Sequence, residues 1–226
     1  FGRLDIIIFS LRKHKVGEIR LSEKVSAYPT NSHFRFLYLW DAIRIGLKLY
    51  KPDVISVQDP FEAGFVGCII SRLRGVPLHT QVHTDFLSSA YRKLSILNRL
   101  RAFLAGFILR HASRVRVVSE RIKRGIEARY HLRAPISVLP IFVDINSFQN
   151  AKIDESLAQR FSKFRTKILV VSRLESEKNV SLAIRAFRES APYDACLIIV
   201  GEGRERQNLE RLAKNLGVSE RTFFEG

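Results

Sequence analysis

Residues 168–203 contain two short apolar runs on either side of an amphipathic segment, and this pattern constrains the fold most strongly. The runs are Ile168–Val171 and Cys196–Val200, and both are rich in β-branched and aliphatic residues, as buried parallel strands are. Between them, apolar residues recur at helical spacing across Val180–Phe187. The stretch is therefore predicted to form a strand, a helix and a second, parallel strand.

The turn after the first predicted strand carries two cations, Arg173 and Lys178. Ligands of open α/β sheets bind at the carboxyl ends of the strands, beside helix N-termini that favour anions. An arginine and a lysine in such a turn would offer a diphosphate a planar fork and a point charge. The competing interpretation is a solvated charged turn, in which Glu175 or Glu177 pairs with these cations.

Upstream, apolar runs alternate with helix-period segments as far as residue 139, which predicts a doubly wound parallel sheet. We expect a first domain over residues 1–145, a linker over 146–165 and a second domain over 166–226. The predicted strands are Leu4–Ser10, Asp53–Val57, Leu78–Val82, Ser113–Val118 and Ile136–Leu139, and the longest predicted helix is Tyr91–His111.

The chain is strongly basic, with 38 lysines and arginines against 22 acidic residues and a formal net charge of +16. Such a charge is typical of proteins that bind nucleic acid, an anionic membrane surface or a small anionic ligand. A basic tail, a zinc-finger spacing and the aromatic signature of an RNA-binding sheet are all missing from the sequence, so nucleic acid is not expected as a partner. The predicted helix Tyr91–His111 has a basic face with Lys93, Arg99 and Arg101, which fits either core packing with a solvated side or docking on anionic lipid.

Cysteine and histidine usage constrains the compartment and the cofactors. Cys68 and Cys196 both lie in apolar runs, as buried thiols of a reducing compartment do, so we expect a cytoplasmic protein, peripheral on the inner face of the membrane if it docks there. The six histidines have no spacing typical of a metal site, and no metal or other cofactor is expected.

Six stretches together resemble the retaining glycosyltransferases of family 4, which have the GT-B fold. The turn SRLESEKN resembles the family's G/S-R-L-x-x-E-K-N, and VGEG resembles the V-G-x-G that ends its next strand. KPDVISVQDPFEAG, QVHTDF, VVSERIKRGI and VLPIFVDINSF resemble successive segments of the N-terminal domain. In the last of these, Ile141 and Phe142 replace the usual Asn-Gly, while Asp144 and Phe148 match.

The resemblance implies two Rossmann-like domains that face a cleft, and transfer of a sugar from a nucleotide-diphospho-sugar with retention of configuration. It assigns Arg173, Lys178, Gly201 and Gly203 to the donor. Read without the resemblance, the glycines permit a tight turn and no more. The acceptor is unknown, and in this family it is often lipid-linked or a polysaccharide.

The resemblance also assigns His83, after the strand Leu78–Val82, to the catalytic site, where it would orient the donor sugar. Thr84 and Asp85 follow as candidate acceptor or sugar contacts. The competing interpretation is a capping or packing histidine, with Asp85 as a helix N-cap.

The resemblance further implies a fragment, inert by itself, that lacks the first strand of the N-terminal domain and the later part of the C-terminal domain. The family's pair of glutamates has no counterpart up to Gly226, and a sheet without its remaining elements would expose one face. Two alternatives remain: a non-catalytic nucleotide-sugar or nucleic-acid binding module, and another Rossmann enzyme such as an epimerase or dehydrogenase. Arg206 stands where a dinucleotide fingerprint needs its third glycine.

Overall fold

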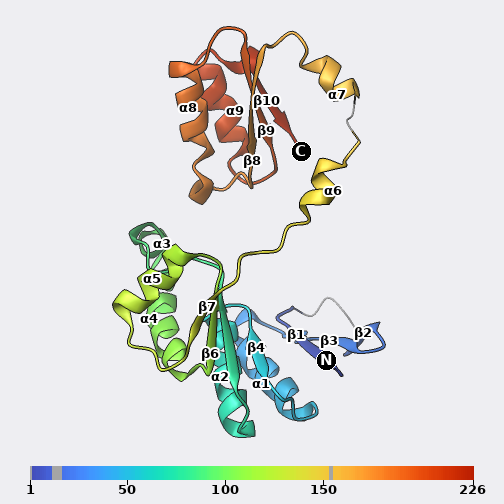
Figure 1. The fold of residues 1–226 in the computed structure, drawn as a ribbon, viewed down its shortest axis with the longest axis vertical. Coiled ribbons are helices and arrows are strands. Elements are labelled where there is room, and N and C mark those ends of the chain that lie inside the picture. The colour runs from blue at the N-terminus through green and yellow to red at the C-terminus, as the bar shows by residue number, and fades with distance from the viewer. Residues whose placement is uncertain (1, 12–16, 153–154) are drawn as a thin grey trace. The chain divides into compact units, whose positions relative to one another are not determined.

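A computed structural model of the chain describes residues 2–11, 17–152 and 155–226, and it divides into two compact units, Phe1–Val143 and Asp144–Gly226 (Figure 1). The expected linker, residues 146–165, falls inside the second unit in this division. Phe161 and Phe164 explain why, because both are buried in one cluster with Cys196 of that unit's sheet.

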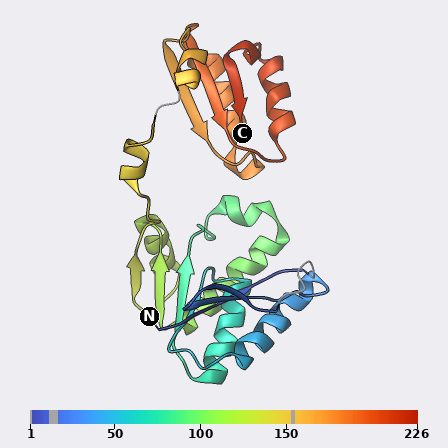
Figure 2. The same ribbon diagram turned by 90° about the vertical axis from the view of Figure 1, so that its right-hand side faces the viewer.

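The first unit is built on a four-stranded parallel sheet, whose arrows run in one direction in Figure 2. Helices cover one face, where Val82, Val115 and Val117 pack against Leu109 and Ile126. The sheet order is β4 (Ile55–Val57), β5 (Leu78–Val82), β6 (Arg114–Val117), β7 (Ile136–Val138), and the covering helices are α2 (Glu62–Arg74), α4 (Ile96–His111) and α5 (Glu120–Arg129).

The opposite face of this sheet carries polar residues at alternate positions. Arg116 donates from Nη1 to Oε1 of Gln81 at 2.6 Å, and Gln81 donates from Nε2 to Oγ of Ser56 at 3.2 Å. Burial, and next the charge of Arg116, lower the pKa of His79. This alternation of apolar and polar residues is what a sheet covered on one face requires.

The first predicted strand lies in a separate three-stranded sheet, and so the expected single sheet is divided in two. Its order is β1 (Leu4–Ile8), β3 (Val25–Pro29), β2 (Ile19–Ser22), with β1 parallel and β2 antiparallel to β3. No strand of the described residues pairs with both β1 and β4. The helix α1 (Tyr38–Lys48), preceded by the short η1 (Arg35–Leu37), packs against α2.

The helix predicted over Tyr91–His111 is two helices. The first, α3 (Ser89–Leu94), ends before Ser95, which has an extended backbone, and α4 begins at Ile96. Ser95 accepts a hydrogen bond at its Oγ from the backbone N–H of Asn98 at 3.1 Å. The break arises because a serine hydroxyl that caps a helix competes with continuation of the preceding one.

The second unit confirms the strand–helix–strand pattern predicted for residues 168–203. Its parallel sheet has the order β10 (Thr222–Glu225), β9 (Ala195–Val200), β8 (Thr166–Val171). Helices α8 (Val180–Ser190) and α9 (Arg206–Asn215) pack on one face around Leu197 and Ile199. The remaining elements are α6 (Ile145–Gln149), α7 (Glu155–Arg160), η2 (Ser176–Lys178) and η3 (Ser219–Arg221).

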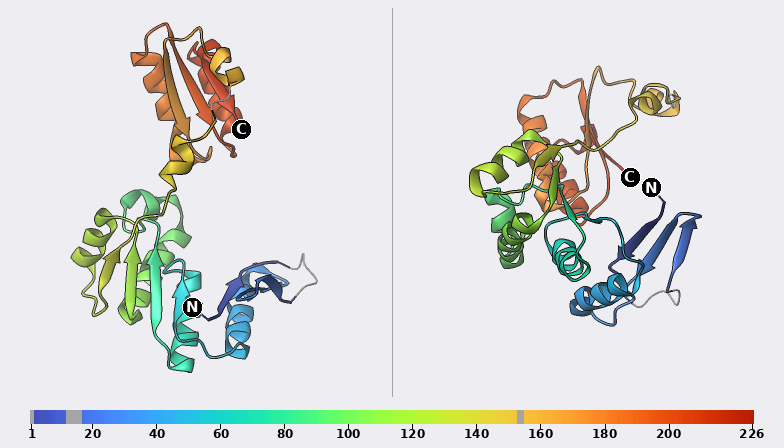
Figure 3. Two further views of the ribbon diagram at one scale, coloured as in Figure 1. Left: turned by 45° about the vertical axis from the view of Figure 1, so that its right-hand side comes forward. Right: turned by 60° about the horizontal axis from the view of Figure 1, so that its bottom comes forward.

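The other face of the second sheet is exposed along β8, whereas Cys196 on β9 is buried. Figure 3 shows α7 on the opposite side of this sheet from α8. Phe161, just after α7, packs edge-on against Phe223 with ring centroids 5.1 Å apart and covers the part of this face around Cys196. Leu169 and Val171 on β8 are 62% and 71% exposed.

Candidate functional site

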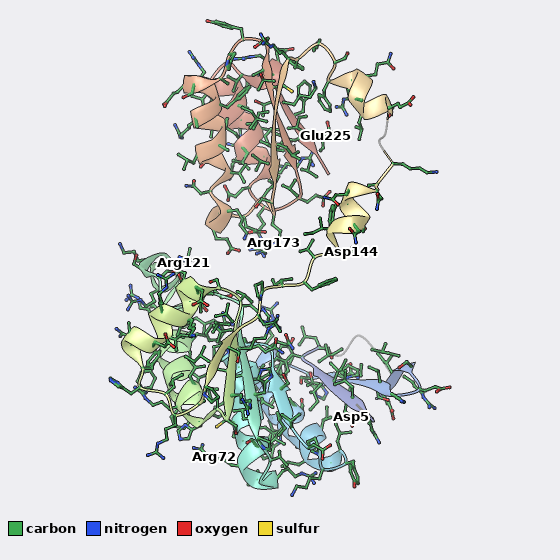
Figure 4. The ribbon with its side chains drawn as sticks, viewed as in Figure 1. Asp5, Arg72, Arg121, Asp144, Arg173 and Glu225 are labelled. Carbon is green, nitrogen blue, oxygen red and sulfur yellow. The ribbon has the colours of Figure 1, made fainter. Side chains whose placement is uncertain are left out.

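The three strands of the second unit end in register, and this places the turn after β8 and the turn after β9 at one edge of the sheet. Val200 on β9 is paired with Val171 on one side and Glu225 on the other. The cation turn (residues 172–179) follows Val171, and Figure 4 shows Arg173 just beyond the end of β8. Parallel strands that end together bring their following turns together, which is where α/β proteins bind ligands.

Gly201 and Gly203 allow the turn after β9 to lie directly on the cation turn. A Cβ at Gly201 would overlap the carbonyl oxygen of Ser172 and lie 2.9 Å from its carbonyl carbon. A Cβ at Gly203 would overlap the carbonyl of Leu174, 2.5 Å from its carbon and 2.8 Å from its nitrogen. These glycines therefore fix the position of the cation turn, while any contact with a ligand stays a prediction.

Backbone hydrogen bonds continue the pairing of β8 and β9 through the two turns. Ser172 donates to Val200 at 3.0 Å, and Leu174 donates to Glu202 at 2.8 Å. The carbonyl of Leu174 accepts from Glu205 at 2.9 Å, and the Leu174 side chain is fully buried. The main chain of residues 172–174 is therefore held as firmly as a strand.

Arg173 forms an ion pair with Glu177, four residues further on, with Nη2 and Oε1 2.7 Å apart. The two side chains are 68% and 45% exposed, and an exposed pair of this kind contributes only a few tenths of a kcal/mol. The ion pair expected for a solvated charged turn is thus present between Arg173 and Glu177. Because it is so weak, it leaves the guanidinium free to exchange Glu177 for a stronger anion.

Lys178 and the N-terminus of α8 complete the positive end of the cation turn. Within the described part of the chain, no carboxylate lies at ion-pair distance from the exposed Lys178 side chain. Asn179 adopts the left-handed conformation, with φ of 48°, and turns the chain into α8. The first N–H groups of a helix carry a partial positive charge, so the turn, the lysine and the helix favour an anion at one place.

In the first unit, the loop after β5 carries His83 and Thr84 with exposed side chains. Among the described residues no hydrogen bond or ion pair involves the His83 side chain, which does not fit a capping or packing histidine. Asp85 forms an ion pair with Arg121 of α5 at 2.9 Å. Ser88, not Asp85, caps α3, because its Oγ accepts from the N–H of Tyr91 at 3.2 Å.

Asp59 lies two residues after the end of β4. Its Oδ1 accepts a hydrogen bond from the N–H of Phe61 at 2.8 Å. Burial, and to a smaller degree the charge of Glu62, raise the pKa of Asp59, against the backbone hydrogen bonds that lower it. A half-buried carboxyl group at the carboxyl edge of the sheet is a group that sequence periodicity does not reveal.

Arg101 does not belong to the free basic face expected for this region. Its Nε and Nη2 contact Oε1 of Glu62 at 2.8 and 2.7 Å, and both side chains are half-buried. This pair joins α4 to α2. Of the three cations expected on that face, Lys93 and Arg99 are exposed, and Arg101 has a structural role.

The described residues contain no group of three or more histidine, cysteine or acidic side chains arranged to hold a metal ion. None of their helices combines the length and apolar character needed to cross a membrane.

Two family models match the chain in succession. The model described as Glycosyltransferase Family 4 matches residues 5–147, and the model described as Glycosyl transferases group 1 matches residues 153–226. The alpha-monoglucosyldiacylglycerol synthase of Streptococcus pneumoniae is 25% identical over 190 residues, which are 79% of this chain and 43% of the relative. The chain thus spans about half the length of the curated relatives it matches.

Solved structures resemble the chain in fold. Anabaena HepE in complex with UDP and glucose has a TM-score of 0.68 and 23% identity, over 88% of this chain and 55% of the other. Sucrose-phosphate synthase from Thermosynechococcus elongatus has a TM-score of 0.77 and 14% identity, over 98% and 60%.

Proposed function

Because the chain belongs to glycosyltransferase family 4 and has the GT-B fold, we propose that the protein containing it transfers a sugar from a nucleotide-diphospho-sugar, with retention of configuration. The observation that carries this proposal is the cation turn. Arg173, Lys178 and the N-terminus of α8 gather at the edge of the sheet, on a main chain locked by the turn that contains Gly201 and Gly203.

The chemistry of the reaction explains why cations belong there. Cleavage of the bond between the anomeric carbon and the diphosphate leaves negative charge on the departing nucleoside diphosphate. Positive groups that are already in place stabilise that charge without reorganising during the step. Arg173 provides a planar fork for two phosphate oxygens and Lys178 provides a point charge, and both are exposed and able to reach a ligand.

Exchange of partners at Arg173 is the first step of donor binding in this proposal. The weak pair with Glu177 holds the guanidinium when no donor is bound. A diphosphate brings more negative charge and two oxygens for the guanidinium fork, so it displaces the single carboxylate. Glu177 then stays exposed to solvent, where its charge is stabilised by water.

His83, from the first unit, orients the donor sugar in this proposal, and Thr84 and Asp85 contact the sugar or the acceptor. The unpaired, exposed imidazole of His83 supports this role. Asp85 is held by Arg121 and is the better fixed of the two neighbouring side chains.

The acceptor that we propose is a lipid-linked molecule at the cytoplasmic face of an anionic membrane. Two observations support this choice. The net charge of +16 favours an anionic surface, and one relative is named alpha-monoglucosyldiacylglycerol synthase.

The test is substitution of the two cations in the natural protein that contains this chain. We expect Arg173→Ala or Lys178→Ala to remove about 2 to 4 kcal/mol of transition-state stabilisation, as loss of one preorganised donor does, and so to lower kcat/KM by roughly thirty- to a thousandfold. Arg185→Ala is the matched control, because it removes an exposed cation from the same helix α8, away from the turn. Unchanged kcat/KM in both turn variants would contradict the proposal.

A further inference from the structure

A trough with a volume of about 670 Å³ lies in the first unit between α3, α4 and the C-terminal end of α5, and its lining also includes Leu87 of the loop that carries His83. Its floor forms where Gly106 meets Tyr130. A Cβ at Gly106 would lie 2.8 Å from Cε1 of Tyr130, so only glycine lets the ring lie directly on the backbone of α4. The lining includes Leu87, Ala102, Phe103 and Phe107, and is mainly apolar.

Five cations also line the trough, and no carboxylate does. They come from three helices, which makes the positive charge a property of the trough rather than of one helix face. They are Arg92 and Lys93 of α3, Arg99 and Arg110 of α4, and Arg129 of α5.

One of these arginines is positioned by a ring contact inside the trough, and another has a buried donor without a partner. Arg110 lies over the ring of Tyr130, with 5.2 Å from Cζ to the ring centroid. The Nε of Arg92 is buried and has no hydrogen-bond partner among the described residues. A buried guanidinium nitrogen without a partner is costly, and an anion that draws the group toward it would reduce that cost.

An exposed apolar stripe runs along α4 beside the trough. Ile96, Leu100, Phe103 and Phe107 follow one another at spacings of four, three and four residues, so they share one side of the helix. Their side chains are 75%, 61%, 82% and 42% exposed. A continuous apolar stripe in water, with cations beside it, is the arrangement by which a helix lies in the interface of a membrane.

We propose that α3 and α4 dock on an anionic membrane and that the trough binds one anionic phospholipid. The acyl region contacts Phe103 and Phe107, and the phosphate lies among Arg92, Lys93 and Arg99. This rests on the membrane contact of the proposed function and adds the lipid class and the site. Two aliphatic residues in the stripe, Ile96 and Leu100, favour lipid over a nucleic acid, whose bases need aromatic faces.

The test measures flotation of the full chain with vesicles of phosphatidylcholine alone and of phosphatidylcholine mixed with phosphatidylglycerol, without any nucleotide sugar. Only the mixed vesicles should bind, and less so as salt rises. The double variant Lys93→Gln, Arg99→Gln should bind roughly thirtyfold more weakly, about fivefold for each cation. Phe103→Ser should also weaken binding. Because the Phe103 side chain is 82% exposed, its loss should not disturb folding, so a folding defect would not account for weaker binding.

Matched controls separate a site from diffuse charge. The pair Arg44→Gln, Lys48→Gln removes two exposed cations from α1 and leaves the same net charge as the trough pair. Phe36→Ser removes a side chain that is 74% exposed in η1. Both controls should bind vesicles as the unchanged chain does, and a loss equal to that of the trough variants would overturn the proposal.

Two further arms separate the ligand from its alternatives. A short-chain phosphatidylglycerol should compete with vesicles better than glycerol phosphate, and equal competition would mean a headgroup site without a lipid. Binding of a single-stranded oligonucleotide that the trough variants lose, with no vesicle binding, would overturn the lipid in favour of nucleic acid. Arg173→Ala should leave vesicle binding unchanged, so failure of sugar transfer and failure of lipid binding are distinguishable.

Discussion

Replacement of Gly203 by alanine should destabilise the second unit severely while leaving the first unit folded. The new Cβ would overlap the carbonyl of Leu174, and the obstructing atoms are backbone, which cannot move aside as a side-chain tip can. The two turns must separate by a distance on the order of 1 Å before the methyl group reaches ordinary van der Waals contact.

The cost follows from what that separation breaks. The hydrogen bonds from Leu174 to Glu202 and from Glu205 to Leu174, 2.8 and 2.9 Å long, contribute about 1 kcal/mol each. The Leu174 side chain, fully buried, would lose part of its packing, which we put at about 1 to 2 kcal/mol. The free energy of unfolding of the second unit should therefore fall by about 3 to 4 kcal/mol.

Gly217→Ala is the matched control in the same unit. Gly217 also has a positive φ, 69°, but a Cβ there would meet nothing within 4 Å. It should cost only the left-handed backbone conformation, about 1 to 2 kcal/mol. Gly203 also has a positive φ, 158°, so both variants carry a backbone cost, and the larger loss at Gly203 reports mainly the steric contact between the turns.

Urea unfolding with two probes measures this difference. The only tryptophan, Trp40, is in α1 and reports on the first unit, while far-ultraviolet circular dichroism reports on both. Gly203→Ala should move the part of the dichroism transition that fluorescence does not follow, by about 1 M urea or more. A variant no less stable than Gly217→Ala, or one that moves the Trp40 transition equally, would refute the steric argument.

Two further predictions concern the first unit. In the natural protein, His83→Ala should lower turnover but leave the Kd of the nucleoside diphosphate unchanged, because the second unit binds the phosphates in the proposal. Equal losses of turnover and of nucleoside diphosphate affinity would refute that division of roles. The pKa of Asp59 is higher in the folded state than in the unfolded state. Its contribution to the free energy of unfolding is therefore fully present below the unfolded-state pKa of about 3.9 and is lost as pH rises through the folded-state pKa. Asp59→Asn keeps an acceptor for the N–H of Phe61, so at neutral pH this variant should have a higher free energy of unfolding than the unchanged chain in urea titrations followed by Trp40 fluorescence. The difference should vanish in acid. A more stable unchanged chain at neutral pH would contradict this reasoning.

Local patterns predicted the parallel strands of the two larger sheets and helix α8, because the apolar period specifies them directly. The break at Ser95 could be predicted in principle, because a serine hydroxyl can cap a new helix by accepting a hydrogen bond from the backbone N–H three residues later, here that of Asn98. It was missed because Leu94 and Leu97 continue the apolar period on both sides. The apolar period shows which side of a helix is buried. It does not show a break between two helices when the apolar spacing continues across the break.

Contacts between distant residues were beyond the reach of the sequence. The pair of Asp85 with Arg121 and that of Glu62 with Arg101 join different helices and loops, and no local spacing encodes them. The second pair also changed an interpretation, because it removed Arg101 from the basic face. The trough depends on the same kind of information, since its five cations come from three helices.

The cation turn separates the residue that would act on a ligand from the residues that hold it in place. Arg173 is exposed, while its neighbour Leu174 is fully buried and hydrogen-bonded through both its N–H and its carbonyl. The position of the arginine is thus set by the main chain and not by the side chain's own contacts, of which the Glu177 pair is weak. A change at Arg173 should therefore weaken ligand binding with little effect on folding. A change at Gly203 should first destabilise the fold of the second unit and, as a consequence, abolish ligand binding. This ordering of effects is what a preorganised anion site requires, because the charge must be in place before the ligand arrives.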